Sequence, residues 1–106
     1  MAMKLVSLLR MAPGQTRKAF RDRYETQHVP FIRSVLPGIE SYRRNYFVET
    51  TGGFDVMTEL TFASVDDFDA AMAIATSSPV AQQIAADEEG LFDRAATLVA
   101  PVDMRE

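Results

Sequence analysis

The chain has 106 residues and a formal net charge of −4, and 47% of its residues are apolar, 25% are charged and none is cysteine. This length supports one domain over residues 1–106, and the composition excludes a disordered tail, a fibrous repeat and a membrane span. The lack of cysteine excludes disulfides, thiolate metal sites and cysteine nucleophiles, and it agrees with the cytoplasmic location that we expect.

The first predicted element is an apolar strand over residues 3–9, which is followed by a turn at Pro13-Gly14. Its apolar run is too short for a signal peptide and far too short to span a bilayer. Thr16 can cap a helix over residues 17–27, because its side-chain oxygen can accept a hydrogen bond from a backbone N–H of the first turn.

A single proline divides this first helical region. Pro30 removes a backbone donor and disfavours helix at the residue before it, so we expect the helix to end or kink near His28. A second short helix can follow over residues 31–36, because a missing N–H is harmless in a first helical turn. Phe20 and Tyr24 lie four residues apart on one helix face, and His28 extends that row.

A hairpin is predicted next, with strands over residues 41–48 and 54–62 joined by a turn at residues 50–53. Alternation along the second strand places one group of side chains together: Val56, Thr58, Leu60 and Phe62. The opposite face of that strand carries the remaining group: Met57, Glu59 and Thr61.

Two helices and a strand complete the predicted order. Ser64 can cap a helix with an acidic first turn. The apolar stripe of that helix is Phe68, Ala71, Met72 and Ala75. Ser78-Pro79 can begin another helix, with the serine as its cap, and Gly90 can end it. A last strand follows over residues 97–102.

The order strand, helix, strand, strand, helix, strand predicts an α+β fold of the ferredoxin-like βαββαβ type. With right-handed crossovers, the four strands form one antiparallel sheet with the helices on one face. The other face is partly apolar and uncovered, so we expect a second copy of the chain to cover it in a two-fold homodimer.

The register of the first hairpin strand decides which side chains lie on this uncovered face. Alternation places Arg43 and Asn45 there, beside Glu59 of the neighbouring strand. A slip of one residue would place Arg44 and Tyr46 there instead.

Several short motifs in this sequence are similar to those of one known family. They are Lys4 to Arg10, Tyr24-x₃-His28-x-Pro30, Leu36-Pro37-Gly38, Ser78-Pro79 and Phe92-Asp93. In their order and spacing they resemble the EthD family, a branch of the dimeric α/β-barrel superfamily, over essentially the whole chain.

The resemblance implies a dimer whose two sheets pack face to face, with a small pocket in each subunit between the sheet and the helices. Relatives on this fold include muconolactone-type isomerases, polyketide cyclases, cofactor-free monooxygenases and haem-binding proteins. The founding member of the family is tied to degradation of a fuel ether. Short members are often labelled reductases, but this sequence has no nucleotide-binding signature. The fold alone does not name the reaction.

His28 is the only histidine, and an unperturbed pKa of about 6.5 lets this side chain exchange protons near neutrality. The resemblance places a pocket histidine at this position. One interpretation makes His28 a general base or acid that acts on a small apolar substrate. The other makes it a structural residue that holds the helix end through a bond to a backbone carbonyl.

Five further residues are candidates for substrate binding. Tyr24 can donate a phenol hydrogen bond to a carbonyl or enolate oxygen, or it can be a core aromatic residue, and Phe31 lies on the same face. Arg43 and Asn45 can bind a carboxylate or stabilise an oxyanion. Glu59 is close enough to pair with Arg43, and that pair could equally set the strand register.

No cofactor or metal site is predicted, because one histidine without cysteine does not make a zinc site and no phosphate-binding or nucleophile motif is present. The run Asp87-Glu88-Glu89 is unusual, because acids near a helix C-terminus are disfavoured by the helix dipole. These acids are expected to have basic partners from the first half of the chain, within one subunit or across the dimer.

The charge is divided between the two halves of the chain. Residues 1–47 contain nine basic and three acidic residues, whereas residues 48–106 contain two basic and twelve acidic residues. The halves can face each other, or a partner subunit, and neutralise each other. The net acidic chain lacks both the positive surface and the base-stacking signature of a nucleic-acid binder.

These observations lead to two main hypotheses of function. In the first, the protein belongs to catabolic or secondary metabolism and is a cofactor-independent isomerase or cyclase of a small hydrophobic carbonyl or aromatic compound, with His28 transferring the proton. In the second, it binds such a ligand without chemistry, or serves an oxidative degradation pathway as an accessory protein. A haem-binding protein with His28 as axial ligand is a further alternative.

Overall fold

The computed structural model describes residues 2–105. In chain order the elements are β1 (Met3–Leu9), α1 (Arg17–Arg23), η1 (Tyr24–His28), α2 (Val29–Val35), β2 (Ile39–Thr51), β3 (Phe54–Phe62), α3 (Val65–Ala75), α4 (Val80–Glu88), η2 (Arg94–Ala96) and β4 (Leu98–Asp103). Of the two η elements, η1 is a π-helix and η2 is a 3₁₀-helix.

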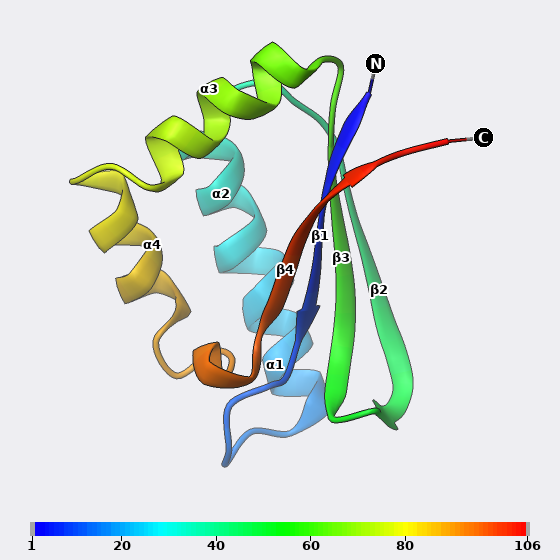
Figure 1. Ribbon diagram of the computed structural model, residues 1–106. Helices are drawn as coiled ribbons and strands as arrows, with labels where there is room; N and C mark the ends of the chain where they lie inside the picture. The colour runs from blue at the N-terminus through cyan, green and yellow to red at the C-terminus, as the bar shows by residue number, and fades with distance from the viewer. Residues whose placement is uncertain (1, 106) are drawn as a thin grey trace.

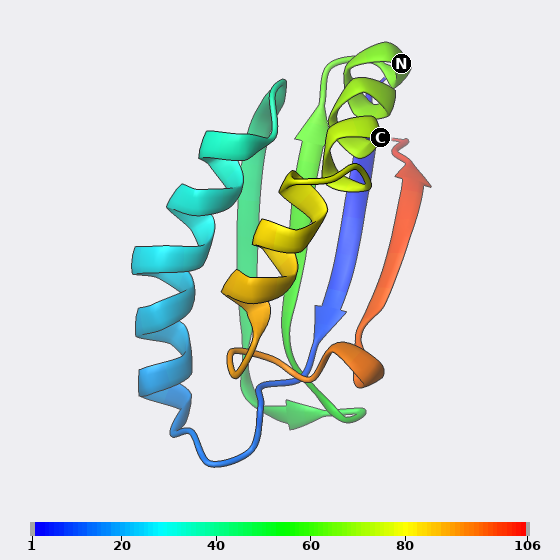
Figure 2. The same ribbon diagram turned by 90° about the vertical axis from the view of Figure 1, so that its left-hand side faces the viewer.

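The four strands form one antiparallel sheet in the order β2-β3-β1-β4. The helices α1 to α4 all lie on one side of this sheet (Figure 1, Figure 2). The predicted α+β class, the ferredoxin-like order and the one-sided helix layer are therefore confirmed. None of the helices within residues 2–105 combines the length and the apolar character that crossing a membrane would require.

The strand register settles which residues face the helices. The buried residues of β3 on the helix side include Val56, Thr58, Leu60 and Phe62, as alternation predicts. Opposite β3, Arg43 pairs with Glu59 and Asn45 pairs with Met57. Residues directly opposite in an antiparallel pair share a face. Arg43 and Asn45 therefore lie on the uncovered face, and Arg44 and Tyr46 lie on the helix side.

The predicted break near His28 is found: α-helical geometry is interrupted by η1, which ends at His28, and α2 follows it, although the chain stays helical through residues 17–35 (Figure 2). The departure from α-helical geometry is a π-turn, in which the Val29 N–H donates to the Tyr24 carbonyl five residues before it. Pro30 lies in the first turn of α2, where no N–H is required. The wider π-turn also relieves the clash between a proline ring and the preceding carbonyls.

The first predicted caps are confirmed. Thr16 Oγ1 accepts a hydrogen bond from the Ala19 N–H at 3.1 Å, at the start of α1. Ser64 Oγ accepts one from the Asp67 N–H at 3.1 Å, at the start of α3. Each cap satisfies a backbone donor that the first turn of a helix leaves free.

The start of α4 differs from its prediction. Pro79 precedes the helix and no side chain caps it, so the predicted serine cap is wrong. The Ser78 hydroxyl instead donates to Oε1 of Gln82, 2.9 Å away. The end is as predicted: α4 stops at Glu88, and Gly90 takes a φ of +73°, which glycine adopts at little cost.

The core fills the space between the sheet and the helices. Its buried members are Leu9, Phe20, Tyr24, Val29, Ile32, Leu36, Tyr42, Val56, Leu60, Phe62, Ala71, Leu91 and Phe92. The last two come from the segment between α4 and η2, which is held by a bridge between Met11 and Phe92. This segment closes one end of the space under the sheet.

A buried carboxylate ties the loop after β1 to the β2–β3 hairpin. Asp55 is only 4% exposed. Its oxygens accept hydrogen bonds from the Met11 N–H at 2.9 Å, from Arg17 at 3.2 Å and from the Thr50 hydroxyl at 2.5 Å. These partners replace the water that the carboxylate loses on burial.

Candidate functional site

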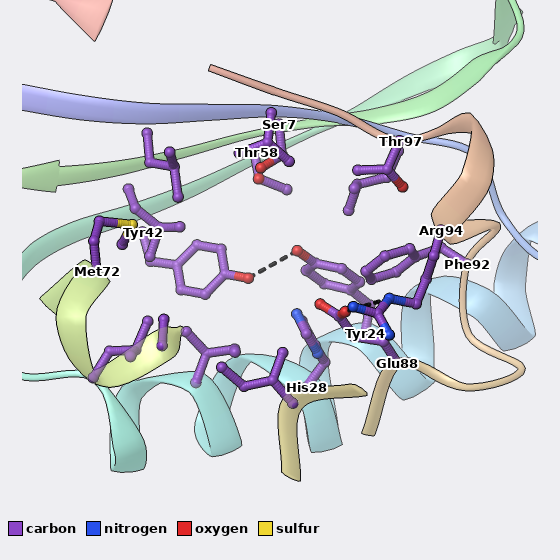
Figure 3. Close-up of a pocket in the computed structure, with 18 residues that line it drawn as sticks. Ser7, Tyr24, His28, Tyr42, Thr58, Met72, Glu88, Phe92, Arg94 and Thr97 are labelled. Atoms are coloured by element: carbon purple, nitrogen blue, oxygen red, sulfur yellow. Dashed lines mark hydrogen bonds and ion pairs between the residues drawn. The ribbon is translucent and has the colours of Figure 1, made fainter. Parts of the chain in front are cut away.

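A cavity of about 390 Å³ lies between the sheet and the helices, a volume suited to one small organic molecule. Most of its lining is apolar: Leu5, Leu9, Ile32, Leu36, Leu60, Met72, Ala75, Ile84, Phe92 and Val99. The polar lining residues are Ser7, Tyr24, His28, Tyr42, Thr58, Glu88, Arg94 and Thr97. Figure 3 shows how these side chains converge on the cavity.

His28 lies at the end of η1 with its side chain only 5% exposed. Its Nδ1 is 2.5 Å from Oδ2 of Asp87. An ionised carboxylate can only accept a hydrogen bond, so Nδ1 carries the proton and donates it to Asp87. The other ring nitrogen, Nε2, keeps its lone pair. His28 lines the cavity and its ring points towards the two tyrosine hydroxyls (Figure 3).

The electrostatic surroundings keep this imidazole neutral. Burial lowers the pKa of His28 below its usual value of 6.5, and the hydrogen bond to Asp87 opposes this shift without cancelling it. The charge of Arg23 lowers the pKa further. At pH 7 the ring is therefore an uncharged proton acceptor.

Packing fixes the position of the His28–Asp87 pair. The His28 ring centroid lies 4.7 Å from that of Tyr24, and 5.9 Å from that of Phe92 in an edge-on contact. Arg23 donates hydrogen bonds to the backbone carbonyls of Asp87 and Glu89, each at 3.0 Å. These bonds hold the C-terminal end of α4 against the first helix, which brings the Asp87 carboxylate to the histidine.

Two tyrosine hydroxyls meet at the centre of the cavity. The oxygens of Tyr24 and Tyr42 lie 2.8 Å apart (Figure 3). Burial raises the pKa of Tyr24 well above its usual value, and burial raises the pKa of Tyr42 to about 12. Both hydroxyls therefore stay protonated at neutral pH. One of them donates to the other, which leaves one O–H able to donate to a carbonyl oxygen of a ligand.

A carboxyl group and a guanidinium group lie close together in the lining. Arg94 Nε is 3.3 Å from Oε1 of Glu88, and the side chains are 57% and 15% exposed. Burial raises the pKa of Glu88 to about 7, because the charge of Arg94 only partly offsets the loss of hydration and Asp87 adds repulsion. Glu88 can therefore take up or release a proton near neutral pH.

Replacing Glu88 with glutamine is expected to change how stability depends on pH. The folded protein holds the Glu88 proton more tightly than the unfolded chain, because the pKa rises from 4.5 to about 7 on folding. This contribution is complete below pH 4.5 and is lost as the pH rises through 7, and in full it amounts to about 3 kcal/mol. Glu88→Gln should therefore be more stable than the parent at pH 8. At pH 5, where the parent gains the contribution of protonated Glu88, the variant should lose this advantage.

Urea unfolding at both pH values measures this difference. His28 shifts stability in the opposite direction, because its pKa is lowered, but it does so equally in both proteins. The difference between parent and variant therefore isolates Glu88. An identical pH dependence in the two proteins would contradict the assignment.

The structure brings only some of the predicted site residues together. Tyr24 and His28 line the cavity. Phe31 packs against the margin of the core and is not part of the lining. The other three candidates lie across the sheet from the cavity, on the uncovered face: Arg43, Asn45 and Glu59.

The expected pairing of Glu59 with Arg43 is replaced by other contacts. Lys4 Nζ lies 2.9 Å from Oε1 of Glu59, and Asn45 Nδ2 lies 3.1 Å from Oε2. These two hydrogen bonds, of which that from Lys4 has the larger effect, lower the pKa of Glu59. Arg43 remains opposite Glu59 in the register and is exposed.

Four residues of the site were not predicted: Tyr42, Asp87, Glu88 and Arg94. The acidic run at the end of α4 carried a signal, because it was expected to need basic partners. Only part of this prediction is met: His28, from the first half of the chain, binds the Asp87 carboxylate, whereas the partner of Glu88 is Arg94 from the second half, and Arg23 binds backbone carbonyls of the run. Within residues 2–105, no group of three His, Asp or Glu side chains is placed to hold a metal ion.

Comparisons with known proteins agree with this architecture. A family model described as EthD domain matches residues 12–95. An ethyl tert-butyl ether D (EthD) family protein from Bacillus halodurans superposes with a TM-score of 0.72 at 17% identity, over 99% of this chain and 100% of that chain. A search of curated proteins found no match.

Two further solved structures are similar. A hydroxynitrile lyase from Passiflora edulis has a TM-score of 0.70 at 16% identity, over 99% of this chain and 94% of that chain. A dimeric ferredoxin-like protein of unknown function from Jannaschia has a TM-score of 0.65 at 15% identity, over 98% of this chain and 100% of that chain. At these identities the likeness shows the fold alone.

Proposed function

The chain belongs to the EthD family, and from this premise we propose that it is a cofactor-independent proton-transfer catalyst of the isomerase or cyclase type. Its substrate is a small hydrophobic carbonyl or aromatic compound held in the cavity beside His28. The observation that carries the proposal is the 2.5 Å bond between His28 Nδ1 and Asp87, which leaves Nε2 as a base in an apolar cavity.

The proposed chemistry begins with a carbon acid. His28 Nε2 takes a proton from the carbon next to a carbonyl group, and the electron pair of that C–H bond moves into the carbonyl to form an enolate. The free O–H of the Tyr24–Tyr42 pair donates to the enolate oxygen. The imidazolium then returns its proton to a different carbon, which completes an isomerisation without any co-reactant.

Asp87 supports this cycle in two ways. Its bond to Nδ1 fixes the tautomer in which Nε2 is unprotonated, and its negative charge stabilises the imidazolium that forms. The apolar lining keeps water away from the enolate and strengthens the hydrogen bonds around it. The existence of a hydroxynitrile lyase with a similar fold supports the view that this architecture can carry catalysis.

Proton exchange at carbon tests the proposal without the natural substrate. Small aryl ketones such as acetophenone and 1-indanone are incubated with the protein in D₂O, and the loss of α-proton signal is followed by NMR. Exchange faster than in buffer with an equal concentration of free imidazole supports catalysis. Ketones that shift cavity resonances without exchanging would favour the alternative, a ligand-binding or accessory protein.

We also propose that the protein forms a homodimer through the uncovered sheet face. Leu8 lies opposite Leu98, and Val6 lies opposite Ala100, which gives this face an apolar strip. Leu98 is 58% exposed in the single chain. Solvent-exposed apolar strips of this kind mark association surfaces, and a neighbour of the same fold is described as dimeric.

Replacing Leu98 with lysine is expected to separate the subunits. The parent should have about twice the 11.8 kDa mass of the chain by analytical ultracentrifugation. Leu98 lies on the edge strand opposite Leu8, so a lysine there would leave an uncompensated charge in the interface, and Leu98→Lys should be monomeric. Val65→Lys, on the exposed start of α3, is the matched control and should remain dimeric. A monomeric parent would contradict the proposal.

A further inference from the structure

One end of the cavity carries opposite charges, and we call it the polar end: Glu88, Arg94 and Thr97. Figure 3 shows these three residues on one side of the cavity, with Met72 on the other. Among the lining residues, Arg94 is the one permanent cation and Glu88 is the one carboxylic acid. Arg94 is also the more exposed of the two.

The guanidinium of Arg94 has N–H donors that are not bonded to other parts of the described chain. Its Nε faces Glu88 at 3.3 Å. Its two terminal nitrogens make no hydrogen bond with any side chain or backbone group of residues 2–105. A guanidinium with free terminal nitrogens matches the planar geometry of a carboxylate.

We propose that the polar end is a receptor for the carboxylate of an otherwise apolar ligand, in which Arg94 binds the carboxylate and Glu88 takes up a proton when the ligand enters. This assignment rests on the proposed function for the place where the ligand lies. It adds the substrate class, an apolar body with one carboxylate head.

The charges around Glu88 explain why binding and protonation are coupled. Ionised Glu88 neutralises Arg94, and a second carboxylate beside it would be repelled. Neutral Glu88 leaves Arg94 free to attract the anion. The raised pKa of Glu88, about 7, allows this switch near neutrality.

Other charged or titratable groups lie around this position on four elements. Asp87 precedes Glu88 on α4 and is bound to His28 of η1. Arg23 of α1 donates to backbone carbonyls at the end of α4. Tyr42 of β2 lies close enough for the Glu88 charge to raise its pKa. None of these groups supplies a second free cation to the lining, so the receptor depends on Arg94.

The rest of the cavity limits the ligand to a monoanion with an apolar body. A single guanidinium compensates one negative charge, and most of the remaining lining is apolar and includes Leu36, Leu60 and Met72. A doubly charged phosphate would bring a second charge without a partner. A carboxylate carries one negative charge, which Arg94 alone can compensate.

The experiment compares phenylacetate with phenylacetamide, which have the same shape and differ in charge. Binding of each is measured by calorimetry at pH 6 and pH 8, where phenylacetate is ionised throughout. Glu88 is about nine-tenths protonated at pH 6 and about one-tenth at pH 8, given its pKa of about 7. Phenylacetate should therefore bind about tenfold more tightly at pH 6, and phenylacetamide should bind equally at both.

Three variants separate the contributions. Glu88→Gln should bind phenylacetate tightly at both pH values, which removes the tenfold difference. Arg94→Gln should lose the preference for the acid over the amide. Arg105→Gln, an exposed arginine paired with Asp103 in the C-terminal segment, is the matched control and should bind like the parent.

Two results would overturn the inference. One is equal binding of acid and amide by the parent at pH 6, including no binding of either. The other is a tenfold pH dependence that persists in Glu88→Gln, which would assign the effect to His28. The His28 ring resonances report on the proposed function separately. If the amide shifts them and the acid has no advantage, the cavity is a ligand site and only the carboxylate receptor is wrong.

Discussion

Replacing His28 with glutamine is expected to lower the rate of ketone α-proton exchange by about 10²–10⁴-fold, the range that positioned general bases contribute. Glutamine has a similar reach and can keep a hydrogen bond to Asp87, but it has no basic nitrogen. The variant should therefore stay folded and still bind the ketone. The measurement is the exchange rate in D₂O by NMR, with folding checked by circular dichroism.

Two further variants define what this loss means. Asp87→Asn should reduce exchange about 10–100-fold, because the amide no longer fixes one tautomer or stabilises the imidazolium. Phe31→Leu is the control on the neighbouring helix, since Phe31 does not line the cavity. It should exchange at the parent rate. If His28→Gln exchanges the ketone protons as fast as the parent, His28 is not the catalytic base.

Replacing Phe20 with alanine is expected to lower the free energy of unfolding by about 3–5 kcal/mol. Phe20 is 2% exposed, and its ring lies 5.9 Å from that of Tyr24 and 6.4 Å from that of Tyr46. Its removal leaves a void that the sheet and the first helix together cannot fill. A domain of this size has only about 5–15 kcal/mol of stability, so the effect should be large in urea unfolding.

Val48→Ala is the matched control for this prediction. Val48 is 98% exposed, so its truncation should change the free energy of unfolding by less than about 0.5 kcal/mol. The two variants are compared by their urea midpoints at equal slope. If the free energy of unfolding of Phe20→Ala lies within about 1 kcal/mol of the parent value, the packing described here for Phe20 is contradicted.

Local patterns were sufficient to predict most of the fold. The alternation of β3 separated the buried face from the face with Glu59, because a strand places successive side chains on opposite sides. Thr16 and Ser64 were recognised as caps, because their side-chain oxygens satisfy free N–H groups within three residues. Both features depend on neighbours in the sequence, and both were confirmed.

The π-turn and the serine before α4 show where local patterns were insufficient. Pro30 correctly predicted an interruption of the α-helix near His28, but it did not predict the form of that interruption, a π-turn in which Tyr24 and His28 are buried. Ser78 has a favourable residue type for a cap. Its hydroxyl bonds instead to Gln82 once the chain has entered α4.

The site was harder to predict than the fold, because it is formed by residues that are far apart in the sequence. His28 and Tyr24 could be selected from the sequence because they share one helix face. Asp87 lies 59 positions from His28 along the chain, so only the packing of α4 against the first helix brings them together. The same holds for Tyr42, which meets Tyr24 from the sheet. Arg43, Asn45 and Glu59 were selected by charge, but their register places them across the sheet from the cavity.

The pH titration of His28 by proton NMR tests the central claim most directly, because a single histidine gives one set of ring resonances. The titration is run with and without acetophenone. We predict a pKa below 6.5, a neutral ring with its proton on Nδ1, and resonances that shift when the ketone is added. A pKa at or above 6.5 with resonances that ignore the ketone would contradict a ligand-facing base, and His28 would then be a structural residue.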